Sequence, residues 1–591
     1  MSIPQRQFSY TNSERRASVV VGSVGRAGLF IPSDFISPTG PIGNDDDEFE
    51  QYQSISDELD PEQGIESYHP QEIQRKASRQ LLSEEAELLA ASRLPIRRYS
   101  SSGPDPVTTG TSPLVKSDPD AIVESWEDAM AHGGIKTTPK LELKVLTKSS
   151  IPLVITFVLQ NSMSVASVFS VGHIGATELA AVTLGSMTAN ITGYALIQGL
   201  ATSLDTFLPQ AYGAKKYKLV GLVLQRCTAL IMVCMLVICL SWWLFAEQVL
   251  VSMLPDPVSA RLAAQYLRLV SYGIPGYVLF ETGKRFLQAQ GIFHASSYVL
   301  FVCAPLNAIM NYVFVWNSVV GLGFIGAPIS VSINYWLMAL GLFLYTVTSK
   351  SEINPMRCWN GFQFVKAFKN WGELMSLALP SVIMIEAEFL AFEILTLMAS
   401  YLGTTALAAQ SVIATMSSLT YQVPFGISIA CSTRIANFLG ARLPESAKIC
   451  TQVSLAFGLV ISFLNCAFFL IGKQSIASWF TSDPDVIAEV AKVLPLIAFI
   501  QIWDALNAVT AGCLRGQGMQ KIGGIVNMVA YYVVGIPLAI PLAFYTPLRL
   551  FGLWIGTGLG LLIIGIVQGY YCLKADYQEL VNQAIERSSH E

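Results

Sequence analysis

Charged residues are scarce in this chain of 591 residues. Asp, Glu, Lys and Arg make up only 13% of it, whereas hydrophobic residues make up 52%. A soluble globular protein has about 25% charged residues. The chain lacks the polar surface that a soluble fold of this size needs, and its composition therefore indicates a membrane protein.

Sequence motifs typical of enzymes and of metal sites are also missing. The ten cysteines lie mostly in apolar stretches and form no CxxC pair. There is no phosphate-binding glycine loop, no metal-ligand spacing and no nucleophile with a neighbouring base. We therefore expect no enzymatic activity, no disulfide framework, no metal and no cofactor. A net charge of −5 gives no indication of a nucleic-acid partner.

The first 140 residues differ from the rest. They hold 22 of the 42 acidic residues and 13 of the 37 basic ones. They are rich in Ser, Pro and Gly, lack long apolar runs and contain no signal-peptide core between residues 1 and 40. Such a segment cannot bury enough surface to offset its ordering entropy. We expect 1–140 to be a disordered, acidic, cytosolic tail.

Short motifs in this tail suggest regulation and sorting. ERRAS, RKAS and RRYS each place a serine two residues after a basic pair, which makes Ser18, Ser78 and Ser100 candidate kinase sites. EEAELL, with Glu84 four residues before Leu88 and Leu89, matches an acidic dileucine signal for adaptor binding. A short amphipathic helix explains that segment equally well. The signal would direct the protein to endosomes or a vacuole, and the plasma membrane is the alternative.

Twelve segments of the remaining chain are long and apolar enough to cross a bilayer. They run near 150–172, 179–207, 219–245, 265–289, 295–317, 321–348, 374–401, 407–436, 449–472, 488–513, 523–545 and 550–573. The pattern predicts an all-α membrane protein with two six-helix lobes, 141–348 and 374–575. A cytosolic linker, 349–373, joins the lobes, and a short cytosolic tail, 576–591, follows them.

The second lobe repeats the first. GHIGATELAAVTLGS (172–186) aligns with YLGTTALAAQSVIAT (401–415) such that Gly175 falls on Gly403 and Leu179 on Leu407, an offset of 228 positions. RFLQAQG (285–291) aligns with GCLRGQG (512–518) at an offset of 227. Because six spans is an even number, both halves enter the membrane in the same direction. Loops and helix ends on the side of the N-terminus carry 15 Lys and Arg, and those on the other side carry five. This bias places both termini in the cytosol.

Ionisable groups within apolar spans are costly and usually functional. Glu386, Glu388 and Glu393 lie in the seventh span and Asp504 in the tenth. Their repeat equivalents in the first lobe are not acidic, so the shared scaffold does not require them. Glu386 and Glu393 lie seven residues apart and share a helix face, whereas Glu388 lies about 140° from Glu393.

Two further acids have a structural interpretation. Glu281 precedes Lys284 and Arg285 by three and four residues, the spacing of an intrahelical ion pair. Asp205, near the cytosolic end of the second span, is expected to cap a helix or to pair with the basic loop that follows.

Several motifs together resemble the multidrug and toxin extrusion (MATE) transporters of the eukaryotic, fungal type. They are TSLDTFLPQAYGAKK, ACSTRIANFLGARLPESAK, the LP-x(7)-E pattern of LPSVIMIEAE, and LRGQGMQKIGGIVNMVAYYVVGIPL, and the resemblance spans about 145–575. It implies a V-shaped pair of six-helix lobes. It also carries the cavity carboxylates of the family onto Glu388, Glu393 and Asp504, and a polar position onto Asn190. Glu386 is outside that pattern and stays a candidate on geometry.

Other polar and aromatic side chains near these positions are candidates for the cavity wall. Gln160 and Asn190 lie in the first lobe. Trp503, Phe392, Tyr531 and Tyr532 lie beside the acids, where a ring attracts a cation by about 0.5–2 kcal/mol. Most aromatics in membrane proteins only pack or mark interfaces.

Together these features predict a monomeric, proton-coupled antiporter for small organic cations, drugs or metabolites, which works by alternating access. H⁺ is preferred to Na⁺ because the first span, 151–172, contains no acid. The alternative is a flippase for a lipid-linked head group. Flippase cavities tend to be lined with Arg or Lys, whereas the mid-span charges here are acidic.

Overall fold

The computed structural model describes residues 137–172, 174–253, 257–317, 321–349, 354–472, 475–480 and 484–589. Residues 138–591 form one compact unit. Helices account for almost all of it, and each of the twelve expected spans corresponds to a helix or to a run of helical segments. Among the described residues, eight helices or continuous helical runs are long and apolar enough to cross a membrane.

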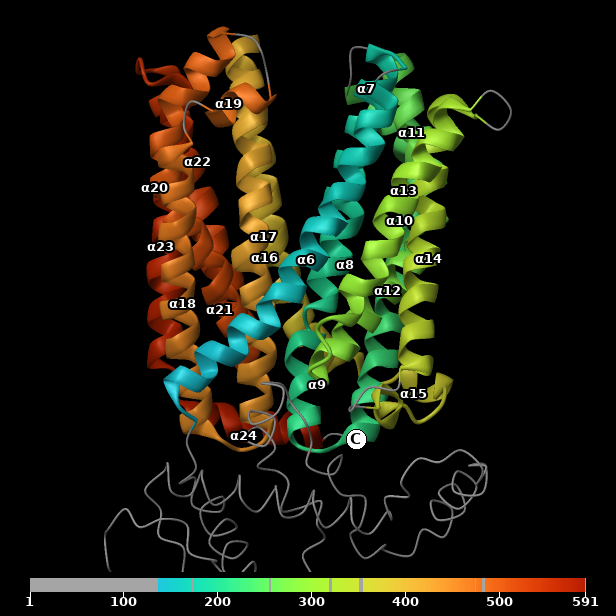
Figure 1. Ribbon diagram of the computed structural model, residues 1–591, viewed down its shortest axis with the longest axis vertical. Coiled ribbons are helices and arrows are strands. Elements are labelled where there is room, and N and C mark those ends of the chain that lie inside the picture. The colour runs from blue at the N-terminus through green and yellow to red at the C-terminus, as the bar shows by residue number, and fades with distance from the viewer. Residues whose placement is uncertain are drawn as a thin grey trace, which may run out of the picture. The chain divides into compact units, whose positions relative to one another are not determined.

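The N-terminal half contains the first six spans (Figure 1). Its elements are α6 (Pro139–Gly172), α7 (Ala176–Ala189), the π-helix η3 (Asn190–Tyr194), α8 (Ala195–Ala201), α9 (Leu204–Gly213), α10 (Tyr217–Met253), α11 (Pro257–Ser271), α12 (Ile274–Ala289), α13 (Ala295–Trp316), η4 (Gly323–Ile325) and α14 (Gly326–Thr348). The second span is the run from α7 to α9. The fourth is α11 and α12, which are separated by a turn before Pro275.

The C-terminal half repeats this arrangement after a linker that contains the short helices η5 (Pro355–Cys358) and α15 (Phe364–Ala367). Its elements are α16 (Trp371–Tyr401), α17 (Thr404–Gly440), α18 (Pro444–Ile471), α19 (Ser475–Phe480), α20 (Pro484–Gln517), α21 (Gln520–Met528), the π-helix η6 (Val529–Gly535), α22 (Ile536–Phe544) and α23 (Arg549–Lys574). Residues 577–589, expected as a tail, form the helix α24 (Tyr577–Ser589).

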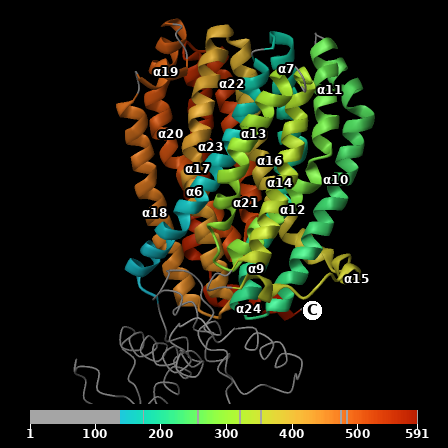
Figure 2. The same ribbon diagram turned by 45° about the vertical axis from the view of Figure 1, so that its right-hand side comes forward.

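The two halves form adjacent helix bundles. Figure 1 shows their ribbons adjoining at the end that carries α9 and α24 and separating toward the end that carries α7 and α19. Figure 2, turned by 45°, shows α6 running obliquely across both bundles. The start of α6 packs on α17 and α18 and its later part packs on α13. There Glu142 accepts two bonds from Arg434 of α17, at 2.9 and 2.8 Å.

Small residues let the halves approach closely, and they do so symmetrically. A Cβ on Gly199 of α8 would lie 2.7 Å from the Cα of Val382, and one on Gly426 would lie 3.0 Å from the nitrogen of Val154. Gly199 and Gly426 are repeat equivalents, and so are Val154 and Val382. The second span of each half therefore packs on the first span of the other, where close packing replaces the hydrophobic effect that is absent in lipid.

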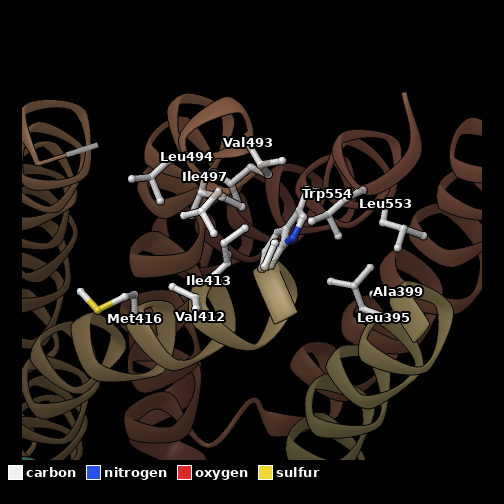
Figure 3. Packing of buried hydrophobic residues seen from close by; sticks show 14 of the residues in the cluster. Leu395, Ala399, Val412, Ile413, Met416, Val493, Leu494, Ile497, Leu553 and Trp554 are labelled. Atoms are coloured by element: carbon white, nitrogen blue, oxygen red, sulfur yellow. The ribbon is translucent and has the colours of Figure 1, made fainter. Parts of the chain in front are cut away.

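The outer surface is apolar and the interior of the C-terminal half is tightly packed. Leu236, Val237 and Leu244 of α10 are 60%, 65% and 63% exposed, a face suited to lipid tails. The buried Trp554 of α23 donates from Nε1 to Gln410 Oε1 at 2.8 Å. Figure 3 shows the residues around it: Leu395 and Ala399 of α16, Val412, Ile413 and Met416 of α17, and Val493, Leu494 and Ile497 of α20.

Candidate functional site

Two of the predicted carboxylates lie within electrostatic range of each other in the C-terminal half. Glu388 comes from α16 and Asp504 from α20, and the two side chains interact electrostatically. Asp504 is 5% exposed, and the side chain of Gln501, one turn earlier on α20, hydrogen-bonds to it. Because the two acids are 116 positions apart in the chain, only the packing of α16 on its neighbours brings them together.

Polar groups from three helices surround this pair. The Tyr421 hydroxyl of α17 hydrogen-bonds to Glu388. Asn507 of α20 also approaches Glu388, but neither of its amide atoms has the geometry of a hydrogen bond to any described residue. Buried amides normally find partners. We call Glu388, Asp504, Tyr421 and Asn507 the acidic site.

The π-helix η6 contributes a further hydroxyl. Tyr531 is 1% exposed, and its phenolic hydroxyl oxygen has no hydrogen-bond partner in the described part of the chain. It interacts electrostatically with Glu388, Asp504 and Tyr421. Single π turns inside α-helices frequently mark functional positions. Tyr531 thus lies within electrostatic range of the acidic site, and its role as a cavity residue stays a prediction.

The other two acids that were predicted as site residues on α16 have different surroundings. Glu386 is half-buried and interacts with Tyr532 of η6, whose hydroxyl donates to the Ala387 carbonyl oxygen at 3.2 Å. Glu393 lies 140° around the helix from Glu388 and is also half-buried. The geometry therefore joins Glu388, rather than Glu386, to the carboxylate of the tenth span.

The remaining predicted cavity residues have other surroundings. Phe392 packs against Trp554 with ring centroids 6.2 Å apart, and Trp503 packs edge-on to Phe499. Gln160 donates to Glu281 Oε1 at 2.9 Å in the N-terminal half. Asn190 begins η3 with an exposed side chain. The structure does not bring these four residues to the acidic site.

The structural interpretation of Glu281 is confirmed. Its carboxylate lies 2.8 Å from Lys284 Nζ and 2.6 Å from Arg285 Nη1. Asp205 also pairs with cations, but they are the buried arginines Arg285 and Arg515 rather than the lysines of the following loop. Ser18, Ser78, Ser100, Glu84, Leu88 and Leu89 lie outside the described residues.

Sequence reasoning missed Tyr421, Asn507, Gln501 and Arg515. A signal for two of them was present, because Gln501 and Asn507 stand three residues on either side of Asp504 and so share its helix face. Tyr421 and Arg515 carry no such signal. Their roles depend on how α17 and α20 pack together.

Known proteins resemble the whole membrane part of the chain. The family model named MatE matches residues 152–313 and again 380–540. An uncharacterized transporter of Saccharomyces cerevisiae is 45% identical over 79% of this chain and 66% of its own length. Multidrug and toxin extrusion protein 1 of Oryctolagus cuniculus is 35% identical over 66% of this chain and 68% of its own length. A crystal structure of the eukaryotic MATE transporter AtDTX14 superposes with a TM-score of 0.70 at 28% identity, over 76% of this chain and all of that one.

Proposed function

Because this chain belongs to the MATE family of transporters, we propose that it exchanges protons for a small organic cation, drug or metabolite across its membrane. Multidrug and toxin extrusion is what the rabbit relative is named for. Coupling to protons and a cationic substrate are our additions for this chain, and they follow from the chemistry of the acidic site.

The observation that carries the proposal is the electrostatic interaction between Glu388 and Asp504. Two neighbouring carboxylates in a low-dielectric setting disfavour their joint ionisation. Such a pair can hold a proton, and it can instead hold a cationic group that neutralises the same charge. Tyr421, Asn507 and Tyr531 supply polar groups around it. Competition between a proton and a cation for this pair produces exchange when the site opens to each side in turn.

We place the end that carries α15 and α24 in the cytosol, because lysines and arginines concentrate in the loops of that side. The bundles adjoin at this end and separate at the other (Figure 1). In this conformation the acidic site would receive a proton from an acidic exterior or lumen and release its cation there. The reverse conformation would return the proton to the cytosol and load the next cation.

The proposal is tested with the full chain in proteoliposomes under an imposed pH gradient. Exchange is followed with ethidium as a cationic probe and with a metabolite mixture analysed by mass spectrometry. Glu388→Gln and Asp504→Asn should each abolish movement of the probe against protons. Glu247→Gln should not, because Glu247 pairs with Arg268 at a half-exposed site outside the acidic site.

Unchanged proton-driven exchange in Glu388→Gln would refute the role given to the acidic site. Transfer of a lipid-linked head group without any cation exchange would instead favour a flippase. A gradient of Na⁺ that drives the probe when a pH gradient does not would correct the coupling ion.

A further inference from the structure

One buried carboxylate, that of Asp205 on α9, lies between arginines from both halves of the protein. Arg285 Nε of α12 is 3.2 Å from Asp205 Oδ1, and Arg515 Nε of α20 is 3.9 Å from Oδ2. All three side chains are at most 6% exposed. These are ion pairs without hydrogen-bond geometry. Because Asp205 belongs to the N-terminal half and Arg515 to the C-terminal half, this is a charged contact across the interface.

Uncharged groups beside this contact join the same two halves of the protein. Thr206 Oγ1 donates to the carbonyl oxygen of Arg515 at 2.5 Å, and Gln520 Nε2 donates to Thr206 Oγ1 at 2.6 Å. If the halves separate at this end, Arg515 must leave Asp205, whereas Arg285 stays with it on the same half. The distance between Arg515 and Asp205 therefore depends on whether the interface is closed or open at this end.

Arg515 also reaches toward the acidic site. Its Nη2 donates to Ser428 Oγ at 2.7 Å, and its guanidinium lies 5.8 Å from the ring centre of Phe425. Phe425 stacks on Tyr421 with centroids 5.8 Å apart, and Tyr421 hydrogen-bonds to Glu388. Arg515 interacts electrostatically with Glu388 as well. The Arg515 guanidinium thus interacts electrostatically with two carboxylates, that of Asp205 in the N-terminal half and that of Glu388 in the C-terminal half.

The aromatic contact continues into the N-terminal half. Phe157 of α6 meets Phe425 edge-on with centroids 4.7 Å apart, and Lys284 Nζ lies 4.9 Å from the centre of the Phe157 ring. A cation from each half therefore rests on a pair of rings that touch across the interface. This packing holds Arg515 close to Asp205 while leaving its guanidinium within the field of Glu388.

Charged and titratable groups surround these residues on five of the helical elements. They are Glu281, Lys284 and Arg285 of α12, Cys227 of α10, Tyr421 and Cys431 of α17, Asp504 of α20 and Tyr531 of η6. Glu281 is held by Lys284 and Arg285. Glu388 and Asp504 form no ion pair with a described lysine or arginine at salt-bridge distance, so they are the carboxyl groups here whose charge a proton can change.

Building on the proton exchange proposed above, we propose that Arg515 couples the charge of Glu388 to the contact between the two halves. An ionised Glu388 competes with Asp205 for the guanidinium and weakens the contact across the interface. When Glu388 takes up a proton or a cation, that competition ends and Arg515 binds Asp205 more strongly. The equilibrium then shifts toward closure at the end of the protein that carries α9, and by linkage the reverse conformation holds the proton less tightly and releases it to the cytosol. Arg515 acts through Asp205 as a positioning residue and does not touch the transported compound.

The test measures the distance between the halves rather than transport. Spin labels are attached to cysteines introduced at Thr183 and Ser411, which are exposed repeat equivalents on α7 and α17. The full chain is used, with Cys234, Cys239 and Cys466 replaced by Ser. In pulsed EPR the wild type should favour the longer distance in acidic buffer and the shorter one in alkaline buffer. Arg515→Gln should lower the ratio of long to short distances in acid about tenfold and remove its dependence on pH.

Matched variants separate coupling from mere structure. Asp205→Asn should behave like Arg515→Gln, and Arg515→Lys, which keeps the charge, should recover much of the response. Glu388→Gln should give the acidic distribution at both pH values. Glu281→Gln removes an equally buried acid that contacts Arg285 within one half, and it should keep the wild-type response. Thermal unfolding checks that each variant is folded, and if Arg515→Gln does not fold, Arg515→Lys and Asp205→Asn decide the question.

Failure of the Arg515 coupling can be distinguished from failure of the proposed proton exchange. If Arg515→Gln and Asp205→Asn respond to pH like the wild type, Arg515 does not couple the two sites, even where proton-driven exchange is intact. If the wild type moves no probe against protons but its distances still depend on Arg515 and pH, the exchange proposal falls and the coupling stands.

Discussion

Gly213 and Gly440 occupy equivalent positions in the two repeats, and each packs against the helix that carries the other. A Cβ on Gly213 would meet the carbonyl oxygen of Asn437, and one on Gly440 would meet that of Gln210. Gln210 and Asn437 are themselves equivalent at the same offset of 227. The contact between α9 and α17 is therefore symmetric about the axis that relates the halves, and a side chain at either glycine would force these helices apart.

Replacing Gly213 or Gly440 by Ala should destabilise this closed interface. Overpacking of a tight contact costs about 1–3 kcal/mol. We expect a lower unfolding midpoint in detergent and a shorter distance between Thr183 and Ser411, because prying apart the end near α9 brings the opposite ends together. Gly372→Ala is the matched control, since nothing lies within 4 Å of its added Cβ. Wild-type midpoints and distances in both interface variants would contradict this account.

Tyr531→Phe should separate function from stability. The Tyr531 hydroxyl is buried without a hydrogen-bond partner among the described residues, so its removal breaks no bond. We expect an unfolding midpoint equal to or above that of the wild type, because an unpaired buried polar group costs about 1–3 kcal/mol. Proton-driven exchange should nevertheless slow, since the acidic site loses a polar group. Paired stability and transport assays measure this, and normal transport would remove Tyr531 from the site.

Glu142→Gln should be strongly destabilising. The Glu142 carboxylate is fully buried and pairs with both Nε and Nη2 of Arg434, which fastens the start of α6 to α17. Removal of one partner leaves an uncompensated buried charge, at a cost of about 3–5 kcal/mol. The double variant Glu142→Leu, Arg434→Met should regain most of the loss because neither charge remains. The unfolding midpoint of the purified protein measures both, and a single variant as stable as the wild type would show that the pair is not needed.

Orientation is open to a labelling test. Phe362, in the linker between the halves, is 72% exposed, and Tyr545, between α22 and α23, is 86% exposed. With both termini in the cytosol, Phe362→Cys should react with a membrane-impermeant maleimide only after permeabilisation. Tyr545→Cys should react from the opposite side, which in intact cells is the outside for a plasma-membrane protein. The reverse pattern would invert the topology.

Much of the architecture could be read from the sequence. Each expected span corresponds to helix, because runs of about 20 apolar residues have few other stable forms in lipid. Their ends were less accurate: α6 begins at Pro139 rather than near 150, and α10 continues to Met253. The added start of α6 carries Lys140, Glu142, Lys144 and Lys148, which lower its hydropathy and so hide it from a search for apolar runs.

The amino-acid sequence by itself determined the duplication, the membrane class and the set of rare acids, because each follows from local composition or from periodic repetition. It also determined the pair of Glu281 with Lys284 and Arg285, since one helix turn joins them. Only the tertiary structure decided that Glu388 rather than Glu386 interacts electrostatically with Asp504, and that Asp205 pairs with Arg515 of the other half. Those interactions join residues 116 and 310 positions apart, and they depend on the rotation and crossing of whole helices, which no local pattern encodes.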